Sequence, residues 1–174
     1  KNSPLIRAFP VIQRIKSRLL PQIFSKEKKQ NYFCPVFYKY YANMKIIGTG
    51  SELPKKIVTN DMLSEFLDTS DAWIYPRTGI RQRHVISDEK LEDLAISAAK
   101  KALDNAGIQA EDLDYIICSN VVNEYITPSL SCIIQGGIGA TCPCLDINCA
   151  CAGFIYALDV ADSHFKSGKV KNVL

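Results

Sequence analysis

The chain has 174 residues, of which 47% are hydrophobic, 22% charged and 9% aromatic, the balance of an ordinary globular protein. No uninterrupted apolar run approaches the about 18 residues of a membrane-spanning helix, and the composition also excludes collagen-like, coiled-coil and wholly disordered proteins. The net charge of +3 is unevenly distributed along the chain. Residues 1–43 hold nine of the 21 basic residues and one of the 18 acidic ones, which leaves 12 basic and 17 acidic residues in 44–174.

This division predicts a boundary between residues 43 and 44. The segment 1–43 is basic, does not begin with Met and is interrupted by four prolines, which disfavour a long amphipathic helix. Three interpretations stay open: a targeting peptide for a plastid or another organelle, an arm that binds a membrane surface or nucleic acid, or sequence read through in frame upstream of a start at Met44. The abrupt change of composition at a Met favours the third, so we predict an extension at 1–43 and the folded part at 44–174.

From Met44 onward, strand patterns and helix patterns alternate. The elements expected first are a short strand at 45–47, a helix from a cap at Thr59 or Asn60 to about Leu67, a helix that Ser70 and Asp71 cap, and a helix over 91–105. The last of these is the clearest, because its apolar residues fall on one face and Gly107 follows where a left-handed cap belongs.

The alternation continues to the end of the chain. The elements expected here are a buried strand at 115–118, a helix with Thr127 as N-cap and Pro128 in its first turn that stops at 136–137, a strand at 144–147, a helix over 151–166 that is apolar almost all round, and a strand that begins at 170. Such alternation predicts an α/β fold around a largely parallel sheet. Because the last strand breaks off at Leu174, we also predict that the chain is a fragment.

Seven cysteines are many for this length, but their number is odd and no secretory signal precedes them. A reducing compartment, the cytoplasm, therefore fits better than a disulfide scaffold. Cys118 and Cys132 lie in strand-like and helix-like apolar runs, where we expect each thiol to be a small buried hydrophobic group.

Cys151 is the candidate nucleophile. It follows the strand at 144–147 and opens the apolar helix, so unpaired backbone N–H groups and the positive end of the helix dipole favour its thiolate form. Its small neighbours, among them Ala150 and Gly153, leave room for a substrate carbonyl, and the amides of the first turn could form an oxyanion hole. A thiol in this position can take an acyl group as a thioester. The alternative is a packed small hydrophobic residue.

Neither histidine is a convincing base for this cysteine. His164 lies thirteen residues further along the same helix, which at 1.5 Å per residue is about 20 Å. His84 belongs to a basic loop over 81–84, where we expect a solvated surface side chain.

A zinc site is the least favoured alternative. The pairs Cys142–Cys144 and Cys149–Cys151 are each separated by one residue, and no histidine lies close to them in the sequence. Structural zinc sites prefer two to four residues between paired cysteines. We therefore expect no metal.

The stretch 69–84 combines aromatic and basic residues. Trp73 precedes Arg77 by one helical turn, which would place a stacking face beside a guanidinium that can bind phosphate. A nucleotide-bearing ligand would suit this pair. The alternative, which the pattern alone favours, is a Trp that anchors the segment to the core, beside solvated arginines.

Taken together, these features resemble the β-ketoacyl-acyl carrier protein synthase III family, condensing enzymes of the thiolase fold. The resemblance covers 44–174 and none of 1–43. The residues that carry it are 45–51, Leu53, Pro54, 59–61, 68–71, Trp73, Ile74, 77–81, Arg83, His84, 127–129, 151–154, Ser167 and Gly168. The resemblance implies the N-terminal half of a layered α-β-α thiolase-like fold.

It also implies the decarboxylative Claisen condensation that starts fatty-acid synthesis. Cys151 would accept the acyl group of acyl-coenzyme A, and the carbanion of malonyl-acyl carrier protein would then attack the thioester. Thr69, Trp73 and Arg77 fall at the coenzyme A-contacting positions of the family, and Trp73 would stack on the adenine. Thr127 falls at the position that lines the partner's acyl pocket in a homodimer. The resemblance implies no cofactor, because acyl-coenzyme A is a substrate, and neither a nucleic-acid nor a membrane partner.

Three residues depart from the family pattern. Pro76 stands before Arg77, where a residue with a backbone N–H is usual, Cys149 stands where Ala is common, and Thr127 replaces a bulky aromatic residue of some members. The family's catalytic His and Asn lie in the second half of the fold, so we expect residues 1–174 alone not to catalyse the condensation.

Other functions stay open. A condensing enzyme of the same fold, of the hydroxymethylglutaryl-coenzyme A synthase or polyketide synthase type, would also use a cysteine thioester, although residues 77–81 favour the fatty-acid branch. A non-catalytic truncated remnant, which folds poorly or binds coenzyme A without turnover, is a hypothesis of a different class.

Overall fold

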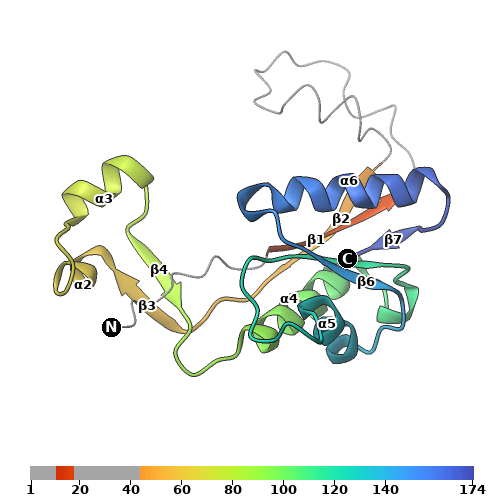
Figure 1. The fold of residues 1–174 in the computed structure, drawn as a ribbon, viewed down its shortest axis with the longest axis horizontal. Helices are drawn as coiled ribbons and strands as arrows, with labels where there is room; N and C mark the ends of the chain where they lie inside the picture. The colour runs from red at the N-terminus through yellow and green to blue at the C-terminus, as the bar shows by residue number, and fades with distance from the viewer. Residues whose placement is uncertain (1–10, 18–43) are drawn as a thin grey trace, which may run out of the picture.

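The computed structural model describes residues 11–17 and 44–174 (Figure 1). The interpretations of the remainder of 1–43 lie outside the described residues. The elements in chain order are β1 (Val11–Ser17), β2 (Met44–Ser51), β3 (Lys56–Thr59), α2 (Asn60–Ser64), α3 (Asp71–Thr78), β4 (Gln82–Val85), α4 (Leu91–Ala106), η1 (Ala110–Asp112), β5 (Ile116–Ser119), α5 (Leu130–Ile138), β6 (Cys144–Ile147), η2 (Ala150–Ala152), α6 (Gly153–Lys166) and β7 (Asn172–Val173).

Five strands line up in one layer in the order β6-β5-β7-β1-β2. β5 and β6 pair in parallel, and β1 pairs antiparallel with both β2 and β7. A parallel bridge between Tyr115 and Val173 joins the two sets, and the N–H of Ile117 donates to the carbonyl of Leu174 over 2.8 Å. The predicted, largely parallel sheet is thus confirmed, with β1 running against its neighbours.

β1 comes from the segment that composition sets apart from the rest of the chain. It pairs along the length of β2, from Val11 opposite Ser51 to Ser17 opposite Met44, with one shift of register. The backbone of this strand therefore fills the position between β2 and β7. The boundary between 43 and 44 stays a prediction.

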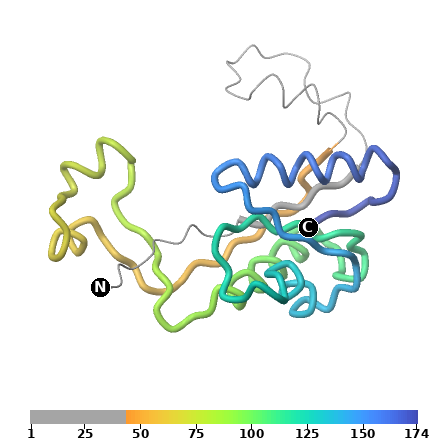
Figure 2. The backbone as a smooth tube through the Cα atoms, viewed as in Figure 1, coloured from red at the N-terminus to blue at the C-terminus, as the bar shows by residue number. Residues whose placement is uncertain are grey.

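Helices cover both faces of the layer, α6 on one face and α4 with α5 on the other (Figures 1 and 2). α4 packs closely on β2 because the two elements present small residues to each other. A Cβ on Gly50 would overlap the carbonyl oxygen of Ala98 and the backbone nitrogen of Ala102, and both alanines are wholly buried. Only glycine permits so close an approach of two backbones.

The core is divided between the two faces. Beneath α4 and α5 it contains Leu91, Ala95, Ala99, Ala102, Leu103, Leu113, Ile116, Leu130, Ile134, Ala140, Cys142 and Leu174. Beneath α6 it contains Leu158, Ala161, Phe165, Val170 and Val173. In the part of the chain that the structure describes, no helix is long and apolar enough to cross a membrane.

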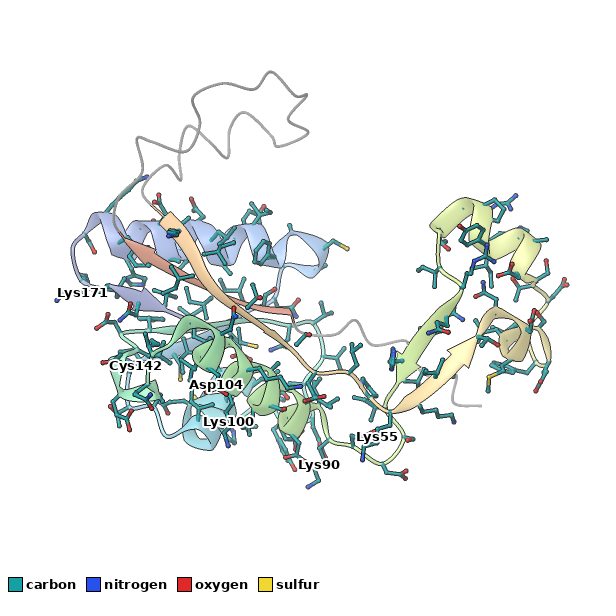
Figure 3. The ribbon with its side chains drawn as sticks, turned by 180° about the vertical axis from the view of Figure 1, so that it is seen from behind. Lys55, Lys90, Lys100, Asp104, Cys142 and Lys171 are labelled. Carbon is teal, nitrogen blue, oxygen red and sulfur yellow. The ribbon has the colours of Figure 1, made fainter. Side chains whose placement is uncertain are left out.

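β3, α2, α3 and β4 form an arm that projects from the layered body (Figures 1 and 2). Glu89 closes the base of the arm, because its carboxylate accepts hydrogen bonds from the N–H groups of Lys55, over 2.9 Å, and Ser87, over 3.2 Å. These backbone donors, Lys55 foremost, lower the pKa of Glu89 to about 2. Lys55 marks the point where the chain enters the arm (Figure 3).

Most of the predicted elements are confirmed. The side chains of Thr59 and Ser70 cap α2 and α3, and Gly107 ends α4 with a φ of 68°. The strand expected at 45–47 is longer and spans Met44–Ser51, whereas α2 ends at Ser64 and not at Leu67.

The predicted start of α5 is wrong. Ser129 is its N-cap, because the Ser129 side chain accepts a hydrogen bond from the N–H of Cys132, and Thr127 and Pro128 precede the helix. Two hydroxyl residues two positions apart have similar capping preference, so local pattern does not distinguish them. The expectation that Cys132 is buried is also wrong, since it is exposed on the first turn of α5.

Two further expectations, on α6 and on the segment 81–84, are wrong. An almost wholly apolar helix is expected to be buried, but α6 is not buried all round, because Phe154, Ile155 and Tyr156 are 44%, 46% and 52% exposed. Residues 82–85 are a strand and not a loop, since β4 pairs with β3.

Candidate functional site

Cys151 lies where β6 passes into α6. It is the central residue of η2, a single turn of 3-10 helix, and α6 continues from Gly153. The N–H of Ala152 donates to the carbonyl of Cys149 over 3.0 Å and so closes this turn, which leaves Cys151 exposed and Cys149 half-buried. The predicted position at a helix start is confirmed, with one tighter turn before the α-helix. The role of nucleophile stays a prediction.

The backbone beside Cys151 is held in an uncommon conformation. Ala150 has a φ of 45°, in the left-handed region, which costs about 1–2 kcal/mol for a residue with a Cβ. Close packing fixes the same turn from the other side, since a Cβ on Gly153 would overlap the side-chain oxygen of Ser119 at the end of β5. Residues held in strained conformations cluster at functional sites. The turn therefore presents an exposed thiol beside a strained and closely packed backbone.

Asp146 organises the elements around this turn, a role that was not predicted from the sequence. Its Oδ1 accepts a hydrogen bond from the N–H of Ser131 over 2.8 Å, and its Oδ2 accepts from the N–H of Leu130 over 3.0 Å and from Nδ2 of Asn120 over 2.7 Å. The carboxylate of β6 therefore holds the first turn of α5 and the end of β5. Its signal in the sequence was an acid within the otherwise apolar strand Cys144–Ile147.

Trp73 and Arg77 lie against each other on α3. The guanidinium carbon of Arg77 is 4.6 Å from the centroid of the Trp73 ring, and Nη1 of Arg77 donates to the Trp73 carbonyl over 2.9 Å. Trp73 is 55% exposed, so the interpretation that it anchors the arm to the core is wrong. Pro76 lies inside α3 but does not end it, because the helix continues to Thr78.

Asn60 fixes the position of α3 on the arm. It is 1% exposed, and its Nδ2 donates to Oδ1 of Asp71 and to the carbonyl of Ile80, both over 2.7 Å. Its Oδ1 accepts from Nη2 of Arg83 over 2.7 Å. The sequence predicted Asn60 only as a possible cap, because the pattern does not reveal that three distant segments meet at one amide.

The two threonines of the predicted site lie in different places. Thr69 is half-buried just before α3, and its N–H donates to the carbonyl of Leu67 over 2.9 Å. Thr127 is exposed in the loop between β5 and α5, beside Ile126, which is 100% exposed. The predicted residues thus occupy three places: the start of α6, the arm, and the β5–α5 loop. In Figure 1, α6 begins at its end nearer the arm.

Both histidines have structural partners. Nδ1 of His84 lies 2.6 Å from the carbonyl oxygen of Pro54, and the ring is half-buried, so the prediction of a solvated side chain is wrong. His164 stacks on Tyr115, with ring centroids 4.7 Å apart, near the far end of the continuous helix α6. Within residues 11–17 and 44–174, no three His, Cys, Asp or Glu side chains gather as metal ligands would.

Residues 75–174 match the family model described as the thiolase N-terminal domain. The chain belongs to the thiolase family. Within this family it is 47% identical over 132 residues to the β-ketoacyl-[acyl-carrier-protein] synthase III of Xanthomonas euvesicatoria pv. vesicatoria, a match that covers 75% of the chain and 41% of that relative. It is 50% identical over 133 residues to the protein of the same name from Clostridium perfringens, with coverage of 76% and 41%.

Solved structures of similar proteins support the same family assignment. The crystal structure of 3-oxoacyl-[acyl-carrier-protein] synthase III from Aquifex aeolicus VF5 matches with a TM-score of 0.72 and 48% identity, over 74% of the chain and 42% of that protein. The priming β-ketosynthase of the R1128 polyketide pathway matches with a TM-score of 0.68 and 34% identity, over 72% and 38%. The predicted thiolase fold and the resemblance to synthase III are confirmed. The chain spans about 41% of the length of these curated relatives.

Proposed function

We propose that the complete protein containing this chain is an acyltransferase that starts fatty-acid synthesis by condensing acyl-coenzyme A with malonyl-acyl carrier protein. The observation that carries the proposal is the exposed thiol of Cys151 on a turn whose backbone is held at a positive φ, at the start of a helix. The likeness to synthases III at 47% to 50% identity supports the same reaction class.

In the first step the Cys151 thiolate attacks the thioester carbonyl of acyl-coenzyme A. A sulfur–carbon bond forms, the coenzyme A thiolate leaves and takes up a proton, and the acyl group stays on Cys151 as a thioester. The N–H groups of Ala152 and Gly153 donate to the carbonyls of Cys149 and Ala150, so the N–H groups of Ala150 and Cys151, earlier in the turn that leads into α6, are the candidates for stabilising the oxyanion.

In the second step malonyl-acyl carrier protein loses carbon dioxide, and the resulting carbanion attacks the acyl carbon on Cys151. The new carbon–carbon bond gives the β-ketoacyl product, and the thiolate of Cys151 leaves. The resemblance assigns the His and Asn of this step to the second half of the fold, so we expect residues 1–174 alone to be inactive. Both steps need a reduced thiol, which places the reaction in a reducing compartment, the cytoplasm or an organelle if 1–43 is a targeting segment.

The arm supplies the binding part of the proposal. Trp73 is half exposed, and a ring in this position can stack on the adenine of coenzyme A while Arg77 pairs with a phosphate. Thr69 lies at the start of the same helix. Thr127 would reach the acyl pocket of the partner in a homodimer, and the exposed apolar residues beside it, Ile126 and Tyr125, fit a surface that a second subunit covers.

The test of the nucleophile is acyl transfer from radiolabelled acetyl-coenzyme A to the complete protein. Cys151→Ala is expected to lower transfer at least about 10³-fold, because it removes the attacking atom. The matched control, Cys149→Ala, removes a thiol two residues away and is expected to retain transfer. Loss of transfer in the Cys149 variant with activity retained in the Cys151 variant would refute the assignment.

The test of the arm is the KM for acyl-coenzyme A. Loss of one stacked base costs about 1–3 kcal/mol, so Trp73→Ala is expected to raise KM about 5- to 150-fold, while Trp73→Phe keeps most of the affinity. An unchanged KM in Trp73→Ala would contradict the adenine site without affecting the role of Cys151.

A second function, priming of a polyketide, uses the same thioester chemistry, and the likeness to the R1128 priming ketosynthase favours it over a hydroxymethylglutaryl-coenzyme A synthase reaction. Competition between the malonyl-loaded carrier proteins of fatty-acid and polyketide synthesis distinguishes the two priming functions. Condensation only with the polyketide carrier would replace the function proposed above.

A further inference from the structure

Two thiols outside the Cys151 turn lie in contact. Sγ of Cys132, on the first turn of α5, is 3.4 Å from Sγ of Cys144, the first residue of β6. A disulfide has a sulfur–sulfur bond of about 2.05 Å, so closure needs the two sulfurs to approach by only about 1.4 Å. The two residues are called the α5–β6 thiol pair below.

The two members of the pair differ in exposure and in the direction in which the pKa of the thiol is shifted. Cys132 is exposed, and the hydroxyl of Ser129 donates to its sulfur over 3.2 Å. This hydrogen bond, and next the one from Cys144, lower the pKa of the Cys132 thiol. Its place in the first turn of a helix favours the thiolate in the same direction.

Cys144 has the opposite environment. It is half-buried, and burial foremost, followed by its contact with Cys132, raises the pKa of its thiol. An exposed thiolate that reacts first, with a protected thiol in contact behind it, is the arrangement of a reactive cysteine and its resolving partner.

The neighbouring cysteines do not share this arrangement. Burial raises the pKa of Cys118 to about 12 and also raises the pKa of the buried Cys142. Cys142 lies on the same chain segment as Cys144, two residues earlier, and therefore serves as a matched control (Figure 3).

We propose that the α5–β6 thiol pair is a site of reversible disulfide modification by a small organic disulfide such as glutathione disulfide. The Cys132 thiolate attacks one sulfur of glutathione disulfide, a mixed disulfide forms, and one glutathione thiolate leaves. The Cys144 thiol then loses its proton and attacks Sγ of Cys132, which releases the second glutathione. Two protein thiols are oxidised and one glutathione disulfide is reduced to two glutathiones, so electrons balance and no other oxidant is needed.

The modification would act on the structure beside the candidate site. The disulfide would fasten the start of α5 to the start of β6, where Asp146 already accepts hydrogen bonds from the N–H groups of Leu130 and Ser131. Oxidation is therefore expected to add a covalent tie between two elements that are held in register now by hydrogen bonds. The proposal does not depend on the condensing activity.

The experiment treats the complete protein with excess glutathione disulfide, blocks free thiols, reduces the sample and labels the released thiols with a second reagent. Chymotryptic peptides are then sequenced by tandem mass spectrometry, since residues 131–145 contain both members of the pair and Cys142. The second label is expected on Cys132 and Cys144 and not on Cys142, and dithiothreitol before blocking is expected to abolish it. Free Cys132 and Cys144 after treatment, or a second label on Cys142 in place of Cys132, would overturn the proposal.

Variants of single cysteines test the order of the steps. Cys144→Ser is expected to retain one glutathione on Cys132, because nothing resolves the mixed disulfide. Cys132→Ser is expected to leave Cys144 unmodified, whereas Cys142→Ala is expected to form the disulfide as the unaltered protein does. Equal oxidation of Cys144 in the Cys132→Ser variant would show that Cys132 is not the attacking thiol. Mapping in the unaltered protein decides the site even where a variant folds poorly.

Discussion

Replacing Asp146 by Asn removes one of the two carboxylate oxygens that join α5, β5 and β6. In the present structure the carboxylate accepts hydrogen bonds from two backbone N–H groups of α5, over 2.8 and 3.0 Å, and from the amide of Asn120, over 2.7 Å. An Asn side chain has a single acceptor oxygen, and its own NH₂ would face a donor at the other position. The amide takes the orientation that keeps more bonds, with its oxygen in the place of Oδ2, so the substitution breaks the bond from Ser131, leaves the other two as bonds to an uncharged group and preserves the shape of the side chain.

The magnitude follows from the broken bond and the two weakened ones. A hydrogen bond to a charged group contributes about 1.5–3 kcal/mol, and because Asp146 is half-buried the lower end of this range applies to each. The broken bond costs about 1.5 kcal/mol and each of the two bonds that lose the charge about 0.5 kcal/mol, so the free energy of unfolding is expected to fall by about 2.5 kcal/mol in Asp146→Asn. In Asp146→Ala, which removes all three bonds, it is expected to fall by about 4.5 kcal/mol.

The assay is equilibrium urea unfolding of the complete protein, followed by circular dichroism, with the exposed Asp68→Asn as control for the loss of one negative charge. The control is expected to stay within about 0.5 kcal/mol of the unaltered protein, as substitutions at exposed positions do. A loss of under about 1 kcal/mol in Asp146→Asn, less than a single such bond contributes, would refute the view that this carboxylate holds the three elements together.

Two further outcomes are expected. Gly50→Ala would force the backbones of β2 and α4 apart, because its Cβ overlaps the carbonyl of Ala98, and should lower the free energy of unfolding in urea by about 3 kcal/mol. The control is Gly136→Ala, where no atom lies within 4 Å of the new Cβ. This variant should not lower the free energy of unfolding and should raise it by up to about 1 kcal/mol, because alanine favours the helix more than glycine does. The pKa of Cys118 is raised to about 12, foremost by burial, so between about pH 9 and 12 the folded state keeps a proton that the unfolded state loses. The free energy of unfolding should therefore fall by up to about 1.4 kcal/mol per pH unit in this range. Cys118→Ala should remove this contribution to the pH dependence.

The sequence predicted those parts of the fold that depend on neighbours along the chain. The caps at Thr59, Ser70 and Gly107 and the strand at Cys144–Ile147 follow from local propensity and periodicity, and they are confirmed. The position of Cys151 at the opening of a helix was predictable for the same reason.

What the sequence did not predict depends on contacts between distant segments. Asn60 and Asp146 each form hydrogen bonds with several distant segments, and the sequence around neither residue predicts its hydrogen-bond partners. The exposure of Trp73 was also beyond the pattern, since an aromatic residue on a short amphipathic turn fits the core as well as the surface. The positive φ of Ala150 is invisible to propensity, which assigns this conformation to glycine.

The hydrogen bonds of Asp146 also bear on the order in which the chain acquires structure during synthesis. Leu130 and Ser131 leave the ribosome before the carboxylate that accepts their N–H groups, and at about 5–20 residues per second the delay is roughly one to three seconds. α5 is a nine-residue helix with two glycines, and isolated helices of that length are marginal in water. During synthesis, α5 is therefore expected to stay helical only after β6 has emerged and paired with β5. The turn that carries Cys151 is the segment synthesised next.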